Sequence, residues 1–245
     1  MLNIVKRYRK GYTGEDIIAQ RTLEDGQWTT VTERVPNNVV NNQISNRAVV
    51  FGNGQSRLDF NVQHILKHKS GLLGADTLQT YGCNAFYREY TPDFMVCSSR
   101  AIAQEMVNTN YTQDKIVYTR VDIMLEFPGK FYLIPHDVYA DAGTTALYLA
   151  AFDGHRRIYM LGFDGQEPTA QNNNVYAGTN GYDATTAQIN SEKWGQAQKM
   201  LFDAYNDVDF VHVSISGRHK IPESWRYCTN LRQITFRQMV LEADL

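Results

Sequence analysis

The sequence has little of several features that mark large protein classes. Its 245 residues include 3 cysteines and 6 prolines, and the formal net charge is only -2. An odd number of cysteines without a Cys-x-x-Cys pair argues against a disulfide framework and a zinc knuckle. The near balance of 24 basic and 26 acidic residues provides no overall positive field, so general nucleic-acid binding is not expected.

Long hydrophobic runs and clustered metal ligands are also lacking. No apolar stretch approaches the roughly eighteen residues of a membrane-spanning helix, and the first residues lack the apolar run of a secretory signal. We therefore expect a cytoplasmic protein without a membrane span. His64 and His68 have helical ligand spacing, but no Glu follows His64 as a zinc-protease motif requires, so no metal site is predicted.

From Arg47 onward, short apolar runs typical of buried strands alternate with helical patterns. Strands are expected at Ala48–Phe51, Leu78–Gly82, Asp93–Cys97, Lys115–Thr119, Lys130–Ile134, Arg157–Gly162 and Phe210–Val213, and helices at Phe60–Lys69, Arg100–Asn108, Gly143–Phe152, Thr185–Tyr205 and Thr229–Glu242. This order predicts the α/β class: a Rossmann-like, mostly parallel sheet with helices on both faces. Ligands of such sheets bind beyond the carboxyl ends of the strands.

Residues 1–46 do not show this alternation of strand and helix patterns. They begin with a basic aromatic cluster, and Asp25-Gly26 followed by the β-branched run to Thr32 predicts a hairpin. The asparagine-rich stretch from Pro36 to Asn46 predicts a linker or extended arm. We expect an N-terminal arm or hairpin in 1–46 and a single domain in 47–245. The arm is a candidate surface for a partner protein or a second copy of the chain.

The loop Gly52-Asn53-Gly54-Gln55-Ser56 follows the first expected strand of this domain. Its glycines permit close approach, and Ser56 can cap the next helix. Its backbone N–H groups could face a phosphate, although a tight turn explains the same residues. Neither the third glycine of the dinucleotide fingerprint nor the Gly-Lys of a P-loop is present.

Two other segments offer ligand-binding groups. Asn84 carries amide donors and a carbonyl acceptor suited to a base or ribose, and a turn asparagine beside core aromatics is the alternative. Gly143, Thr144 and Thr145 begin a helix whose N-terminus attracts negative charge.

A fourth loop follows the central strand at Asp164. The polar stretch from Gln166 to Asp183 contains Tyr176 and Tyr182. A long polar loop at the carboxyl end of a strand is typical of a lid over a site, and a disordered segment is the alternative.

Together the four loops resemble the bacterial lipooligosaccharide sialyltransferases. That family has a Gly-Asn-Gly-Pro-Ser-like loop, a Cys-Asn-x-Phe-Tyr segment, a Thr-Ser-Gly-like helix start and an Ile-Tyr-Leu-Ser-Gly-Ile-Asp strand end. The matching stretches here are Val49–Ser56, Cys83–Tyr87, Ala142–Ala146 and Arg157–Asp164, in the same order over about half of the chain. The related motility accessory factor and hydroxymethylpterin-pyrophosphokinase-like proteins share the glycine loop and are the competing resemblance.

The resemblance implies a transferase that moves a sugar from a CMP-linked nucleotide sugar to an acceptor hydroxyl, such as that of a glycan, with no cofactor or catalytic metal required. It implies contacts to the nucleotide sugar from Gly52, Asn53, Gly54, Gln55, Ser56, Asn84, Gly143, Thr144, Thr145 and Asp164, and to the leaving phosphate from Tyr176 and Tyr182.

The histidine that serves as general base in that family has no counterpart in the stretch from Tyr182 to Gln188. The candidates left for this role are Asp183, His212 and His219. Two alternatives stay open because of this departure. One is a non-catalytic structural or binding protein that retains the fold. The other is a pyrophosphokinase-like enzyme, which would need magnesium and carboxylates; Asp59, Asp137, Asp141 and Asp164 are available in the sequence.

Overall fold

The structure is a computed structural model. It describes residues 2–9, 15–24, 27–36, 46–67, 78–134, 140–164, 173–183, 191–214, 221–243 and 245, and its side chains are described from residue 46 onward, apart from that of residue 191.

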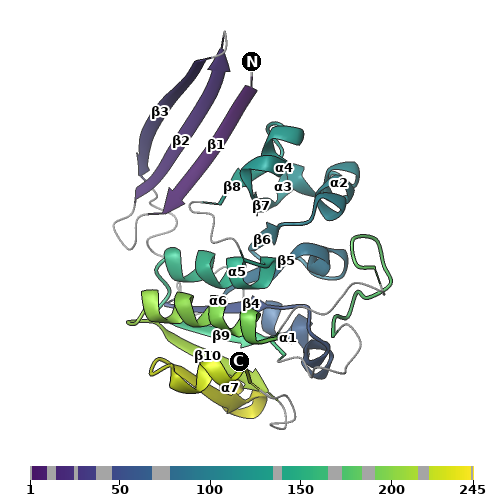
Figure 1. The fold of residues 1–245 in the computed structure, drawn as a ribbon, viewed down its shortest axis with the longest axis vertical. Helices are drawn as coiled ribbons and strands as arrows, with labels where there is room; N and C mark the ends of the chain where they lie inside the picture. Colours follow the sequence, from purple (N-terminus) through teal and green to yellow (C-terminus); the bar gives the residue numbers. More distant parts are fainter. Residues whose placement is uncertain are drawn as a thin grey trace.

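Strands and helices alternate along most of the described chain (Figure 1). The strands are β1 (Leu2–Arg9), β2 (Glu15–Glu24), β3 (Gln27–Pro36), β4 (Arg47–Phe51), β5 (Gln79–Cys83), β6 (Phe94–Cys97), β7 (Ile116–Thr119), β8 (Tyr132–Leu133), β9 (Arg157–Leu161), β10 (Asp209–Ser214) and β11 (Leu231–Thr235). The α-helices are α1 (Val62–Leu66), α2 (Arg100–Asn108), α3 (Tyr111–Asp114), α4 (Val121–Glu126), α5 (Ala142–Phe152), α6 (Ser191–Ala204) and α7 (Phe236–Ala243), and the 3₁₀ helices are η2 (Gln55–Asp59), η4 (Asn84–Arg88) and η5 (Glu223–Tyr227).

All described strands belong to one sheet with the order β11-β10-β9-β4-β5-β6-β7-β8-β1-β2-β3. The pairs from β11 through β8 to β1 are parallel, and β1-β2-β3 are antiparallel. From β4 the chain first extends the sheet through β5 to β8 and then returns to the other side of β4 to add β9 to β11. The strand order therefore reverses between β4 and β9, which is where ligands bind in sheets of this kind.

The parallel strands are covered on both faces, which confirms the predicted fold class. Along β4, Val49 and Phe51 belong to one buried cluster with residues of α1, α2, α4 and α7. Ala48 and Val50 point to the other cluster, which includes α5, part of α6 and Trp225 of η5. Successive side chains of a strand point to opposite faces, so a strand that is apolar throughout must be buried on both sides.

The expected hairpin around Asp25-Gly26 is present as the antiparallel pair β2 and β3, although residues 25 and 26 lie outside the described part. A third strand precedes it, because β1 pairs with β2 and joins the parallel sheet through the bridge between Lys6 and Leu133. Most of the expected linker, residues 37–45, also lies outside the described residues.

The sequence interpretation was wrong at the C-terminus, where one helix was expected at Thr229–Glu242. The structure has β11 followed by α7. Leu231 pairs with Phe210 and Thr235 with Ser214, so this segment forms the edge of the sheet. Pairing with β10, the preceding strand in the chain, overrides a local helical pattern here, and the sequence alone does not reveal that the two segments pair.

Candidate functional site

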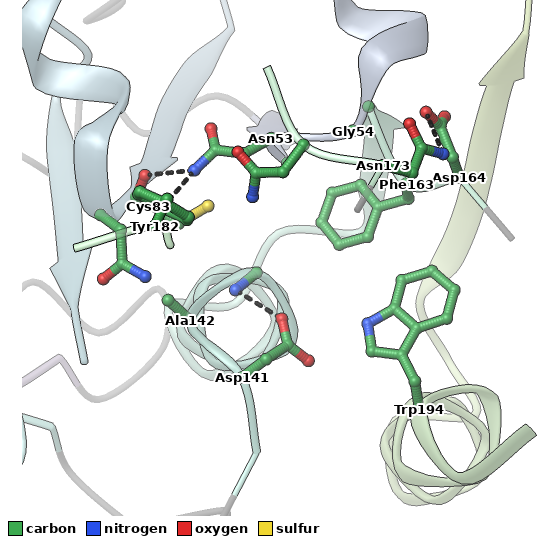
Figure 2. Close-up of a pocket in the computed structure, with 15 residues that line it drawn as sticks. Asn53, Gly54, Cys83, Asp141, Ala142, Phe163, Asp164, Asn173, Tyr182 and Trp194 are labelled. Atoms are coloured by element: carbon green, nitrogen blue, oxygen red, sulfur yellow. Dashed lines mark hydrogen bonds between the residues drawn. The ribbon is translucent and has the colours of Figure 1, made fainter. Parts of the chain in front are cut away.

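A cavity of ≈ 170 Å³ lies at the reversal point between β4 and β9 (Figure 2). Its walls come from the loops after β4, β5 and β9, the start of α5, the 173–183 segment and α6. The lining residues are Gly52, Asn53, Gly54, Cys83, Asn84, Asp141, Ala142, Gly143, Gly162, Phe163, Asp164, Asn173, Asn174, Tyr182 and Trp194. All four loops that the sequence singled out thus contribute to one cavity.

The glycines of the β4 loop allow two loops to pack against each other. The Gly52 N–H donates to the Leu161 carbonyl at 2.8 Å, and the Gly54 N–H donates to the Gly162 carbonyl at 3.0 Å. A Cβ atom at Gly52 would lie 2.4 Å from the Gly162 oxygen. Close packing of backbone therefore accounts for Gly52 without a bound ligand.

The start of η2 is occupied by a carboxylate of the chain. Asp164, 6% exposed, accepts hydrogen bonds from the Ser56 N–H at 2.9 Å and from the Ser56 hydroxyl. The side-chain amide oxygen of Asn173 accepts from the Gln55 N–H at 3.0 Å. These amides, which were expected to face a phosphate, donate to protein oxygens, so an anion would have to compete with Asp164.

The N-terminus of α5 is capped in the same way by Asp141. One of its carboxylate oxygens accepts from the N–H groups of Gly143 at 2.8 Å and Thr144 at 3.1 Å, and the other accepts from the Thr144 hydroxyl at 2.6 Å. An aspartate at this position satisfies helix amides that have no partner within the helix. It also brings a second negative charge to the cavity wall.

Asn53 is fixed by an extended polar network. Its amide nitrogen donates to the Cys83 carbonyl and to the Tyr182 hydroxyl, each at 3.1 Å. Its amide oxygen accepts from Arg57 at 2.8 Å. Arg57 is 2% exposed, donates to the Tyr176 hydroxyl at 3.0 Å and lies 3.5 Å from Glu89. A buried guanidinium thus holds Asn53 and the tyrosine segment in fixed positions.

Asn84 has a left-handed backbone conformation, with φ of 46°. Its side-chain oxygen accepts from the Ser98 N–H at 2.9 Å, which ties it to the loop after β6. Asparagine tolerates this conformation better than most residues with a side chain. The sequence showed a polar residue here, but it did not show that the backbone conformation restricts the choice.

Neither Cys83 nor Tyr182 is ionised near neutral pH. Burial raises the pKa of the Cys83 thiol to about 12, and the charge of Asp141 contributes in the same direction. Burial also raises the pKa of Tyr182 to about 12. Because a thiolate is the reactive form of cysteine, Cys83 is unsuited to act as a nucleophile, whereas the Tyr182 hydroxyl keeps its proton for hydrogen bonding.

The cavity has two chemically different ends (Figure 2). The Asn53 end is formed by Asn53, Cys83, Asn84 and Tyr182. The Trp194 end is formed by Asp141, Phe163 and Trp194, where the two rings lie 6.5 Å apart between centroids with an interplanar angle of 21°. Figure 2 shows Trp194 on α6, across from Phe163 and the start of α5.

The 173–183 segment is attached to the domain through hydrogen bonds to the ion pair between Arg88 and Glu105. Arg88 contacts Glu105 of α2 through two hydrogen bonds of 2.6 Å and also donates to the Thr179 hydroxyl and the Asn180 carbonyl. The amide of Asn180 donates to Glu105. The hydrogen bonds from Arg88 lower the pKa of Glu105 to about 2. These contacts hold the segment that brings Tyr182 to the cavity.

Five residues predicted to bind the nucleotide sugar or its phosphate lie outside the lining. Gln55 is exposed, and Ser56 is buried by its contacts with Asp164. The Thr144 hydroxyl donates to Asp141 and accepts from Gln198, while the Thr145 hydroxyl donates to the Asp141 carbonyl. Tyr176 lies behind the lining on Arg57. The lining itself includes Gly52, Asn53, Gly54, Asn84, Gly143, Asp164 and Tyr182 from the predicted set.

The three candidates for the general base are not brought together in the described residues. Asp183 is exposed beside Tyr182 and is not part of the lining. His212 is 2% exposed, and its ring nitrogens contact the Phe163 carbonyl at 2.9 Å and the Gln233 amide at 3.2 Å. It therefore lies behind the cavity wall. His219 and also His68 lie outside the described residues.

Sequence reasoning missed Trp194, Asn173, Asn174 and the supporting Arg57. Trp194 lies in a segment that reads as an ordinary amphipathic helix, and an aromatic residue in such a helix usually belongs to the core. The two asparagines had a signal, because they lie in the polar loop expected to act as a lid. Arg57 had none, since a charged residue after a glycine loop is normally exposed.

Two absences hold for the described part of the chain. No group of three or more His, Cys, Asp or Glu residues there could hold a metal ion. The carboxylates considered for magnesium are spread out: Asp59 is exposed on η2, Asp141 and Asp164 line the cavity, and Asp137 is outside the described residues. No described helix has both the length and the apolar character needed to cross a bilayer.

The sheet order defines a Rossmann-like α/β fold, and the cavity lies at its switch point. No model of a known protein family and no curated protein matches the sequence. Among solved structures, the chain is similar to an alpha-2,3-sialyltransferase from Campylobacter jejuni in apo form, with 16% identity and a TM-score of 0.43 over 82% of this chain and 96% of that one.

Proposed function

We propose that the protein is a glycosyltransferase that binds a nucleotide sugar at the switch-point cavity and transfers the sugar to an acceptor hydroxyl. The observation that carries this proposal is the convergence of the loops after β4, β5 and β9, the start of α5 and Tyr182 on one cavity. Those loops also carry the resemblance to the lipooligosaccharide sialyltransferases. A CMP-linked donor is the expected type, on that resemblance alone.

The Asn53 end suits the nucleotide and its phosphate. Asn84 and Tyr182 carry uncharged hydrogen-bonding groups, and the Arg57 guanidinium lies directly behind Asn53. Uncharged donors that are already fixed in place stabilise developing negative charge without reorganising during the reaction. The bond from the sugar carbon to the phosphate oxygen breaks, and the electron pair stays on the leaving phosphate, which these groups stabilise.

The acceptor supplies the new bond to the sugar carbon and loses its hydroxyl proton. Asp141 and Asp164 are the carboxylates of the described lining, and Asp141 is the more exposed of the two. A carboxylate within reach of the acceptor hydroxyl can take this proton as a general base. Of the candidates from the sequence for the same role, Asp183 and His219 stay open, whereas His212 lies behind the cavity wall with both ring nitrogens engaged.

Titration calorimetry of the full chain with CMP, UDP and GDP tests the binding step. At least one nucleotide should bind, and Asn53→Ala should weaken that binding by about tenfold, because it removes the hydrogen bonds that position Tyr182 and Arg57 and each such bond is worth about 1 to 2 kcal/mol. Asn84→Gly removes the amide while permitting the left-handed backbone. The exposed Asn108→Ala is the matched control and should bind like the unchanged protein. Absence of nucleotide binding would refute the proposal.

A binding protein without catalysis is the second candidate. It is favoured by the contacts of His212, whose two ring nitrogens are both engaged behind the cavity wall. Slow hydrolysis of a nucleotide sugar by water separates the two candidates, because a transferase usually passes some donor to water and a binding protein does not. Nucleotide release should require Asn53 if the enzyme proposal is correct.

A further inference from the structure

The charges around the cavity indicate which kind of sugar it would accept. Its described lining includes two carboxylates, Asp141 and Asp164, and no lysine, arginine or histidine. Among the segments outside the described residues, 165–172 and 184–190 contain no lysine, arginine or histidine, 135–139 contains His136, and 215–220 contains Arg218, His219 and Lys220. Arg57 is a cation close to the cavity. It lies behind Asn53, and its guanidinium donates hydrogen bonds to Asn53 and Tyr176.

The two carboxylates retain capacity to accept hydrogen bonds from a ligand. Asp141 accepts three hydrogen bonds from Gly143 and Thr144, and Asp164 accepts three from Ser56 and Asn173. A carboxylate offers about four acceptor sites, so roughly one remains on each. Sugar hydroxyls are donors that can fill such sites, and hydrogen bonds to a charged acceptor are the stronger kind.

The aromatic side chains supply the complementary apolar surface. Trp194 and Phe163 face the cavity on the same side as Asp141 (Figure 2). An aromatic face packs well against the C–H face of a sugar ring and provides a large contact area with few rotatable bonds. Aromatic surface beside carboxylates that accept hydrogen bonds from hydroxyl groups fits an uncharged sugar ring rich in hydroxyls.

We propose that the Trp194 end binds a neutral, hydroxyl-rich sugar ring that packs on Trp194 and donates hydroxyl hydrogen bonds to Asp141, and that it disfavours an acidic sugar. This inference rests on the proposed function of nucleotide-sugar binding, and it departs from the acidic sugar that a CMP-linked donor of the resembled family would carry. It separates the ring from the phosphate, which binds at the Asn53 end nearer to Arg57. Among the described lining residues, a sugar carboxylate at the Trp194 end would meet the like charges of Asp141 and Asp164 and no cation, which is unfavourable in a partly buried site.

The test measures how much a sugar adds to the binding of its own parent nucleotide, so that any preference for one base cancels. The ratio of dissociation constants is determined for UDP against UDP-glucose, for UDP against UDP-glucuronic acid, and for CMP against CMP-N-acetylneuraminic acid. Glucose and glucuronic acid differ only in the carboxylate at C6. We expect glucose to strengthen binding and both acidic sugars to add nothing or weaken it, with about tenfold between the matched UDP sugars.

Variants then locate the effect. Trp194→Ala should abolish the gain from glucose, while Trp194→Phe should keep part of it. Asp141→Asn keeps an acceptor for the α5 amides and should reduce the discrimination against glucuronic acid. Met200→Ala, at an α6 position that is 73% exposed, is the matched control and should bind like the unchanged protein. Thermal unfolding of each variant confirms that it is folded.

Each outcome has one meaning. If glucuronic acid or N-acetylneuraminic acid adds as much as glucose, the neutral-ring proposal is wrong, while the nucleotide proposal stands. If nucleotides bind and no sugar changes their affinity, the Trp194 end does not hold a sugar, and the neutral-ring proposal is again wrong. If none of the nucleotides or nucleotide sugars binds, the proposed function itself fails and this inference fails with it.

Discussion

The two ends of the cavity are built by different means. At the Asn53 end, the lining side chain is held by Arg57, a guanidinium that is 2% exposed and that also contacts Tyr176. At the Trp194 end, an indole and a helix-capping carboxylate present surface to the cavity. The first end gains fixed geometry from buried charge, and the second offers groups that a ligand can contact. The comparison separates the residues that build the site from those that select its ligand.

The most severe disturbance should come from the backbone contact on which both ends depend. Gly52→Ala would place a methyl group 2.4 Å from the Gly162 oxygen and force the β4 and β9 loops apart. We expect a loss of about 3 kcal/mol or more in the free energy of unfolding. Urea denaturation measures it. Gly143→Ala, whose nearest contact would be 3.0 Å to Asp141, is the control and should cost much less. Equal losses in both variants would contradict the close-packing explanation.

A smaller effect should follow from loosening the Asn53 end alone. Arg57→Lys keeps the charge but loses the planar group that reaches both Asn53 and Tyr176. Because a buried charge would lose some of its partners, we expect a destabilisation of about 2 to 4 kcal/mol, together with weaker nucleotide binding. Denaturation and calorimetry measure the two effects. Arg100→Gln, with a side chain that is 77% exposed, should change neither by more than about 0.5 kcal/mol. Unchanged stability in Arg57→Lys would show that the network does not hold this end.

The smallest of the three effects concerns the segment that carries Tyr182. The pKa of Glu105 is lowered from 4.5 to about 2, so its ionised form stabilises the folded state above pH 4.5, and that contribution is lost as the pH falls toward 2. Glu105→Gln should therefore lower stability by about 1 kcal/mol at pH 7. The difference should shrink at pH 3.

Thermal unfolding at the two pH values measures this difference. Glu126→Gln, whose partner Arg100 is largely exposed, is the control. If the stability difference between Glu105→Gln and the unchanged protein grows at low pH, the ion pair of Glu105 with Arg88 does not stabilise the folded state.

The sequence was informative where local chemistry decides the structure. The run Ala48–Phe51 with its glycine stop predicted β4 and its loop, and α2 was predicted at Arg100–Asn108, where the structure has it. Ser99 precedes this helix, and its hydroxyl accepts from the Ile102 N–H as a helix N-cap. Strand ends in a parallel sheet meet at one edge, which is why loops far apart in sequence could be assigned to one site.

The parts that could not be predicted depend on partners distant in sequence. Leu231–Thr235 is a strand because β10 lies beside it. Asp164 and Asp141 occupy the helix ends that were expected to attract phosphate, and the residue types alone do not indicate which carboxylate reaches which amide. Trp194 lines the cavity and also packs on the core beside Trp225, and helical periodicity does not show that a core-facing residue reaches a cavity.

The contact between Gly52 and Leu161 couples ligand binding to the folding of the sheet. The cavity joins segments from residue 52 to residue 194, so it forms only when strands of high sequence separation have paired. A ligand of this cavity binds the assembled sheet and not the unfolded chain, and it stabilises the fold in proportion to the logarithm of its concentration at saturation. A rise of the melting temperature with nucleotide concentration therefore reports on the whole sheet, although the ligand contacts only one edge of it.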